Sequence, residues 1–180
     1  CNAKTLAVLP THLCGRVADV DAAVQCARAV GAYVIEDAAQ ALGARCEGKS
    51  VGLKGDVGFF SLAVGKGLST FEGGVLITRN VVLCDALRTT GAGTKFNLWW
   101  ELRRSVELLG YAALYRPSGL RMVYGKPLQK ALSRRNWVAA AGDDFDDFIA
   151  QHHLGAWRQA VGSKALQRLR AFQQHTAVQA

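Results

Sequence analysis

Two short apolar runs joined by a helix-forming segment constrain the fold of this chain more than any other feature. The runs cover residues 5–9 and 32–35, and the second ends abruptly at Asp37. Between them, residues 19–30 have the capping residue and the apolar spacing of a helix. Continuous apolar strands in β–α–β order are typical of a parallel sheet covered by helices. We therefore expect an α/β fold in which ligands bind at the carboxyl ends of strands, where Asp37 lies.

The pattern continues with two more strands and two more helices. Residues 43–58 are rich in Gly and Lys and indicate a loop or hairpin. Further strands are predicted over 57–62 and 74–78, and helices over 81–89 and 154–172. The periodicity does not set the order of the strands.

Composition excludes several classes of protein. Half of the 180 residues are hydrophobic, which is too many for a disordered chain, and the 19 Gly follow no collagen-like period. No uncharged apolar stretch of about 18 residues predicts a membrane-spanning helix. The five Cys include no C-x-x-C pair and the four His no H-x-x-x-H pair, so we expect reduced thiols and no metal site.

Positive charge is concentrated in residues 95–136, which carry nine Lys and Arg against two Glu and hold most of the net charge of +8. Within this segment, one helical face is apolar; it consists of Trp99, Leu102, Val106, Leu109 and Ala113. An amphipathic helix with basic surroundings can rest on an anionic membrane, or it can pack on its own domain or on a partner subunit. The segment contains no nucleic-acid-binding motif, so no nucleic acid is expected.

Three short motifs follow one another in an order that suggests chemistry, although each is weak alone. They are Glu36-Asp37-Ala38-Ala39-Gln40, then Phe60-Ser61, then Gly65-Lys66. An Asp at a strand end is more often a turn former, and a Lys between glycines is more often a solvated loop residue. A P-loop is excluded because Phe60 stands at its first Gly position and Gly67 at its Ser/Thr position.

Taken together, these motifs resemble the DegT/DnrJ/StrS family of pyridoxal-phosphate-dependent sugar aminotransferases. The family runs P-x-H-x-x-G, E-D-A-A-Q, G-D-x-x-x-F-S, K-x-L and G-E-G-G at similar spacings. The matching stretches here are 10–15, 36–40, 55–61, 66–68 and 72–74. The resemblance implies part of the large domain of the aspartate-aminotransferase-like fold (PLP fold type I), a mainly parallel sheet with flanking helices.

The resemblance also assigns roles to side chains. Lys66 matches the catalytic lysine that holds pyridoxal 5'-phosphate as a Schiff base. Asp37 matches the carboxylate that faces the pyridine nitrogen, Gln40 the residue on the ring-hydroxyl side, and Ser61 a phosphate-binding hydroxyl. His12 matches a motif position for which the residues alone indicate a structural hydrogen bond.

The chain departs from the family pattern at several points. Many members have His where Leu42 stands, which puts sugar contacts in question. The family's G-x-N-Y-R-M stretch has no clean counterpart near residues 147–152. Nothing before Thr5 matches the family's phosphate-binding helix or its stacking aromatic ring. We therefore expect a piece of a longer protein that would not catalyse on its own.

By resemblance, the expected activity is transamination of a nucleotide-linked keto sugar with an amino-acid donor, in cell-surface polysaccharide or secondary-metabolite biosynthesis. A homodimer in the cytoplasm, peripheral at the inner membrane surface if residues 95–136 bind lipid, is the expected state. The alternatives are a sensor or regulator that keeps the fold without catalysis, and a basic membrane-surface or nucleic-acid-binding module. The expected organisation is part of the cofactor-binding domain (1–94), a basic aromatic-rich insertion (95–148) and a helix leading to a truncated small domain (149–180).

Overall fold

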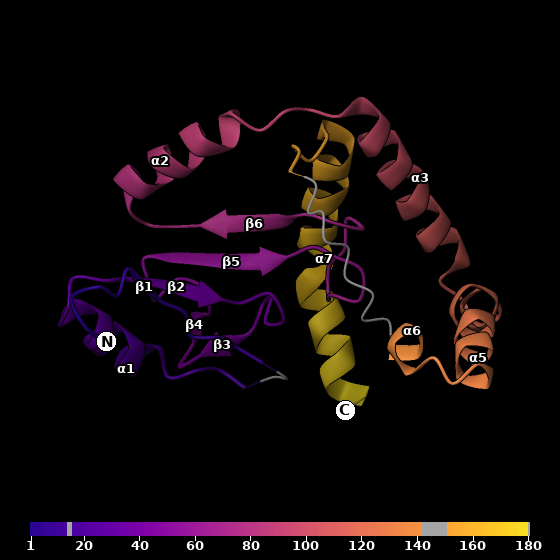
Figure 1. The fold of residues 1–180 in the computed structure, drawn as a ribbon, viewed down its shortest axis with the longest axis horizontal. Coiled ribbons are helices and arrows are strands. Elements are labelled where there is room, and N and C mark those ends of the chain that lie inside the picture. Colours follow the sequence, from indigo (N-terminus) through magenta and orange to yellow (C-terminus); the bar gives the residue numbers. More distant parts are fainter. Residues whose placement is uncertain (14–15, 142–150, 180) are drawn as a thin grey trace. The chain divides into compact units, whose positions relative to one another are not determined.

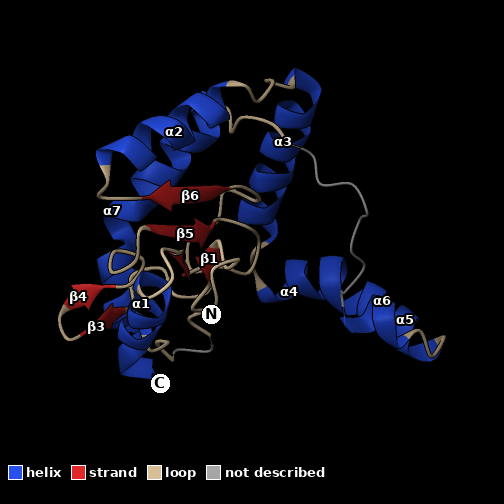
Figure 2. Cartoon of the chain, turned by 60° about the vertical axis from the view of Figure 1, so that its left-hand side comes forward, coloured by secondary structure: helices blue, strands red, loops and turns tan. Residues whose placement is uncertain are grey.

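The structure is a computed structural model that describes residues 1–13, 16–141 and 151–179. It forms two compact units, residues 1–96 with 153–180 and residues 97–152 (Figures 1 and 2). The first break lies two residues from the expected one after residue 94. The second expected break, after residue 148, lies outside the described residues, and the three-part domain assignment stays a prediction.

A four-stranded sheet in the order β1-β2-β5-β6 forms the centre of the first unit. β1 (Ala7–Val8), β2 (Tyr33–Asp37) and β5 (Val57–Ser61) run parallel, whereas β6 (Gly74–Ile77) pairs antiparallel with β5. The mainly parallel sheet is therefore confirmed. β1 is shorter than the run at 5–9 predicts, and β6 turns back on β5 because the loop between them contains no crossover helix.

Helix α1 (Val20–Arg28) makes the crossover from β1 to β2. The carboxylate of Asp19 caps it by accepting a hydrogen bond from the backbone N–H of Ala22 at 2.9 Å. After the helix, Gly31 adopts a positive φ of 73°, a conformation that favours glycine. The apolar side of α1 packs on one face of the sheet in a core made by Val20, Ala27, Ala32 and Val34.

The Gly- and Lys-rich segment forms the predicted hairpin, β3 (Arg45–Cys46) and β4 (Lys49–Ser50). Beside it, a second core joins Ala38, Val51 and Phe60 on the same face of the sheet. Backbones approach closely here, since a Cβ at Gly58 would lie 2.1 Å from the carbonyl oxygen of Gly52. Glycine is therefore required at position 58.

Two longer helices complete the first unit. α2 (Val81–Ala92) is capped by Asn80, whose side chain accepts from the N–H groups of Val82 and Leu83. α7 (Ala156–Gln179) begins two residues later than predicted and extends beyond residue 172. It lies across the end of the sheet toward which β5 points (Figure 1). Arg158 and Gly162, in its first turns, lie against Thr70 in the loop after β5.

All regular elements in the described part of the second unit are helices. It contains α3 (Leu98–Leu114), α4 (Pro117–Leu120), a π-helical turn η1 (Arg121–Gly125), α5 (Lys126–Ser133) and α6 (Trp137–Ala141). The predicted apolar face of α3 exists but is exposed: Trp99 is 79% and Val106 60% accessible. Within the described residues of its own unit, this face is exposed. No helix in these residues is both long and apolar enough to cross a membrane.

Candidate cofactor site

The carboxyl ends of β2 and β5 bring Asp37 and Ser61 to one edge of the sheet. Asp37 lies opposite Phe59 in the parallel register, and Ser61 follows Phe59 by two residues. Because side chains alternate across a strand, all three share one face. α1 and the hairpin cover the opposite face, which holds Val34, Glu36 and Phe60, so Asp37 and Ser61 are left half-buried.

The carboxylate of Asp37 is oriented by the backbone. Its Oδ1 accepts a hydrogen bond from the N–H of Ala39 at 3.0 Å, which closes an Asx-type turn. Within the described residues, Oδ2 accepts no hydrogen bond. One carboxylate oxygen is thus fixed and the other is available to a cationic or hydrogen-bond-donating ligand.

Ser61 and Lys66 flank a tight turn after β5. The N–H of Ala63 donates to the Ser61 hydroxyl at 3.3 Å, and the N–H of Lys66 donates to the Ala63 carbonyl at 3.3 Å. Gly65 has a φ of 83°, a left-handed conformation that favours glycine and ends the turn. The half-buried Lys66 makes no ion pair with any residue that the structure describes. The Lys66 amine therefore lies in the turn after β5 and is not held by any described side chain.

Gln40 and Leu42 lie in the turns that follow β2. The N–H of Ala41 donates to the Ala38 carbonyl at 2.9 Å, and Gln40 is exposed between them. Gln40 therefore sits in a turn, not one turn along a helix. Leu42 packs against the second core, and its carbonyl accepts from Gln173 of α7 at 3.1 Å. The residue that replaces the family's His serves packing here.

His12 makes the structural hydrogen bonds that its position indicates. Its Nε2 lies 3.1 Å from Oε2 of Glu36, and its Nδ1 accepts from the N–H of Ala18 at 3.1 Å. Both His12 and Glu36 are only 1% exposed. The pair lies on the face of the sheet opposite Asp37.

Glu36 is a heavily hydrogen-bonded carboxylate. Its oxygens accept from three backbone N–H groups of the loop before β5: Gly52 at 2.8 Å, Lys54 at 2.5 Å and Gly55 at 2.6 Å. Burial by itself raises the pKa of Glu36, but these donors and His12 outweigh it and lower the pKa below its ordinary value of 4.5. Glu36 is therefore a buried anion solvated by the protein.

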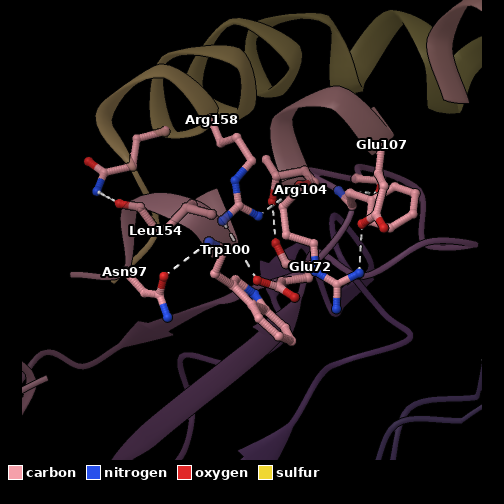
Figure 3. A network of polar contacts seen from close by, with 11 residues as sticks. Glu72, Asn97, Trp100, Arg104, Glu107, Leu154 and Arg158 are labelled. Atoms are coloured by element: carbon pink, nitrogen blue, oxygen red, sulfur yellow. Dashed lines mark hydrogen bonds and ion pairs between the residues drawn. The ribbon is translucent and has the colours of Figure 1, made fainter. Parts of the chain in front are cut away.

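Sequence reasoning missed Arg158 of α7, which is fully buried. Its guanidinium lies 3.6 Å from the carboxylate of Glu72 and donates to the Thr70 carbonyl at 3.4 Å (Figure 3). The loop that carries Lys66 is thereby tied to α7 by a buried cation. Periodicity could not reveal this, because Arg158 stands among mainly apolar and small residues and nothing in the local sequence links it to Glu72.

Two hollows open on the first unit. The larger, of about 530 Å³, lies between α1 and the hairpin and is lined by charged side chains including Asp21, Lys49 and Lys54. The smaller, of about 410 Å³, lies between residues 67–69 and α7. Neither hollow is lined by the predicted site residues Asp37, Gln40, Ser61 and Lys66. The smaller hollow is lined by Gly67, the residue that follows Lys66 in the sequence.

Known proteins share the first half of the chain. A "Pleiotropic regulatory protein" of Geobacillus stearothermophilus is 40% identical over 97 residues, which are 52% of this chain and 26% of the relative. The dTDP-3-amino-3,4,6-trideoxy-alpha-D-glucose transaminase of Streptomyces venezuelae is 43% identical over 86 residues, 47% of this chain and 23% of the relative. The chain thus spans about a quarter of the length of these curated relatives.

Among solved structures, DesI in the presence of its TDP-sugar product matches with 34% identity and a TM-score of 0.48, over 49% of this chain and 23% of that one. Residues 1–112, more than half of the chain, match the sequence model of one protein family. The chain belongs to the DegT/DnrJ/EryC1/StrS aminotransferase family.

Proposed function

We propose that the protein containing this chain is an aminotransferase that moves an amino group from an amino-acid donor to a nucleotide-linked keto sugar. One observation carries the proposal: Asp37 and Ser61 share one face at the carboxyl edge of adjacent strands, and Lys66 follows in the next turn, in the family's order. A transaminase of a dTDP-linked sugar among the relatives supports the substrate class.

The residues present fit pyridoxal phosphate. The second carboxylate oxygen of Asp37, which accepts no hydrogen bond from a described residue, suits a protonated pyridine nitrogen, and the Ser61 hydroxyl suits a phosphate oxygen. The Lys66 amine, which pairs with no described residue, suits the aldehyde. When bound, this cofactor supplies the electron sink that amino-group exchange requires. The carboxylate of Asp37 would hold the proton on the ring nitrogen, and the exposed Gln40 would contact the ring hydroxyl.

Lys66 has two tasks in this proposal. Its amine would hold the aldehyde of the cofactor covalently and would be released when a substrate amine takes its place. Once released, the same amine would act as the general base that takes the proton from the substrate carbon and as the acid that returns it. A flexible lysine after a glycine turn can reach both positions, which an amine fixed in an ion pair could not.

The test uses the longest reading frame that contains this chain. We expect borohydride to trap the cofactor on Lys66 in the wild type and not in Lys66→Ala. Lys49→Ala removes an exposed hairpin lysine and should leave trapping unchanged. Trapping at another lysine in Lys66→Ala would overturn the assignment. Trapping without turnover of any keto sugar would favour the regulator hypothesis, to which the regulatory relative from Geobacillus stearothermophilus also points.

Asp37→Asn separates binding from catalysis in the same protein. The amide keeps the size of the carboxylate but cannot balance a pyridinium charge. We expect the variant to retain part of the cofactor binding and to lose at least about a hundredfold in turnover, the cost of a buried charge interaction of about 3 kcal/mol. Near-normal turnover would refute the role of Asp37.

We also propose a cytoplasmic homodimer that contacts the inner membrane surface through residues 95–136. The support is the exposed apolar face of α3 together with six bases that make no ion pair with any described residue: Arg116, Arg121, Lys126, Lys130, Arg134 and Arg135. Each base near an anionic surface contributes about 1 kcal/mol, screened by salt.

Vesicle co-sedimentation tests this contact. We expect binding to anionic vesicles that is lost at high salt and weakened by Trp99→Ser. Val82→Ser, which changes an equally exposed apolar residue on α2, is the matched control. If neither anionic nor neutral vesicles bind and Trp99→Ser instead dissociates the dimer in light scattering, the face is a subunit interface.

A further inference from the structure

The geometry points to His12 and Glu36 as a positioning pair that fixes the backbone under Asp37 from the opposite face of the sheet. This inference rests on the proposed cofactor site, because it gives two residues outside the cofactor contacts a role in placing Asp37. Neither side chain can touch a ligand bound at Asp37, since both are buried behind β2. They can act only through the backbone.

The backbone at Asp37 is held along both edges. On one side its N–H donates to the Pro10 carbonyl and its own carbonyl accepts from the N–H of His12, each at 2.9 Å. On the other side, the N–H of Ala38 donates to the Phe59 carbonyl at 3.0 Å. The position of the Asp37 carboxylate thus depends on where the segment at residues 10–12 is placed.

The side chain of His12 places that segment. Because Nδ1 accepts from the fixed N–H of Ala18, the ring proton lies on Nε2, which donates to Glu36. His12 therefore bonds to Asp37 through its own backbone N–H and to Glu36 through Nε2. Through Nδ1 it bonds to Ala18, just before α1.

Glu36 in turn is immobilised by the loop before β5. Three N–H groups of Gly52, Lys54 and Gly55 converge on its two oxygens at 2.5–2.8 Å. Charge-assisted bonds to backbone donors are short and directional, so the carboxylate is a rigid anchor. The chain order Glu36-Asp37 places the anchor and the ligand-binding carboxylate on adjacent residues that point to opposite faces.

Two conservative substitutions each keep one of the two side-chain hydrogen bonds of His12. In His12→Gln the amide nitrogen can still donate to Glu36, as Nε2 does. In His12→Asn the shorter side chain can still accept from Ala18 but cannot reach Glu36. If the link to Glu36 positions Asp37, His12→Asn should weaken pyridoxal phosphate binding about tenfold or more, which corresponds to the loss of one buried hydrogen bond. His12→Gln, which keeps the bond to Glu36, should bind the cofactor almost as tightly as the wild type.

The experiment measures cofactor affinity by equilibrium dialysis and the melting temperature of the cofactor-free protein, in the longest reading frame that contains this chain. Val20→Ala, in the core under α1, is the control that destabilises the unit without touching His12 or Asp37. Affinity is compared at a temperature where every variant is folded. A purely structural role of His12 predicts that His12→Asn and Val20→Ala have equal, wild-type affinity, which would overturn the inference.

Two further outcomes keep the conclusions separate. A wild-type protein that binds no pyridoxal phosphate refutes the proposed function. A wild type that binds it, with His12 variants that bind equally well, refutes the positioning pair alone. Should His12→Asn not fold, nitrogen NMR of the wild-type protein decides: a proton on Nδ1 instead of Nε2 contradicts the arrangement.

Discussion

The sheet edge of the first unit and helix α3 of the second differ in which side chains they bury. At the sheet edge, the charge of Glu36 is buried and fully hydrogen-bonded, and apolar residues such as Val34 are enclosed. In α3, Leu102 and Val106 are exposed while Glu101 is buried. A region that solvates its own buried charge is structurally self-sufficient, whereas one that exposes an apolar face offers a surface to something else.

The charges of the second unit fit this contrast. Arg103 and Arg104 both pair with Glu107, at 3.0 and 2.7 Å (Figure 3 shows the Arg104 pair). The six bases between Arg116 and Arg135 have no such partner in the described chain. Substitutions of buried residues at the sheet edge should therefore lower stability more than substitutions of exposed apolar residues on the helices do.

Gly58→Ala should have the largest effect on stability. A Cβ at this position would lie 2.1 Å from the Gly52 carbonyl oxygen, a distance at which backbone must move. The Gly52 N–H also donates to Glu36, so the shift would disturb the buried anion as well. We expect a loss of about 4 kcal/mol, which would leave little folded protein. Chemical denaturation measures it.

Gly91→Ala is the control for this substitution. Gly91 lies in α2, and a Cβ there would meet nothing within 4 Å. The change should stabilise the protein by about 0.5–1 kcal/mol through helix propensity. A similar loss in both variants would show that close packing at Gly58 is not the cause.

Glu36→Gln should cost about 2–3 kcal/mol at pH 7, because the amide nitrogen would face backbone donors. The pKa of Glu36 is lower in the folded state than its ordinary value of 4.5, so its contribution is present above that pH and is lost as the pH falls through the folded pKa. The difference between wild type and variant should therefore shrink below about pH 4.5. A pH-independent difference in urea denaturation would argue against an ionised Glu36.

The sequence could predict the elements of the sheet edge because each has a local signal. The capping residues Asp19 and Asn80, the apolar runs and the glycine-rich hairpin all lie where the pattern indicates. The short β1 and the antiparallel β6 were not predictable, since strand length and order depend on tertiary pairing. Asp37 and Ser61 are the last residues of β2 and β5, while the roles that the family motifs assign to them and to Lys66 stay predictions.

Longer-range features carried no local signal. The Arg158–Glu72 pair joins residues 86 positions apart, and the donors to Glu36 come from a loop that looks merely solvated in sequence. The amphipathic pattern of α3 predicted its helix and its apolar face, but not whether that face is covered. Burial depends on the partner of a face, which periodicity does not contain.

A matched pair of apolar truncations tests the contrast directly. Val34→Ala, at a residue 1% exposed, should cost about 2 kcal/mol through lost burial and a cavity. Leu102→Ala, at an exposed position of α3, should change the free energy of unfolding by less than about 0.5 kcal/mol. Denaturant melts of the two variants measure both values. A larger loss for Leu102→Ala in the isolated subunit would mean that the α3 face is already covered.

Arg104→Gln should have a smaller effect than Val34→Ala. Burial alone raises the pKa of Glu107, but its bonds to Arg104 and Arg103 outweigh this and lower the pKa below the ordinary value of 4.5. The pair therefore stabilises α3 above that pH and stops doing so as Glu107 is protonated. Its side chains are partly exposed, so we expect a loss of about 0.5–1 kcal/mol at low salt, reduced at high salt. Hydrogen exchange at α3 amides reports it locally. Arg116→Gln removes a base that pairs with no described residue and should leave this hydrogen exchange unchanged. If exchange at the α3 amides is accelerated equally in both variants, the cause is the change in net charge and not the ion pair.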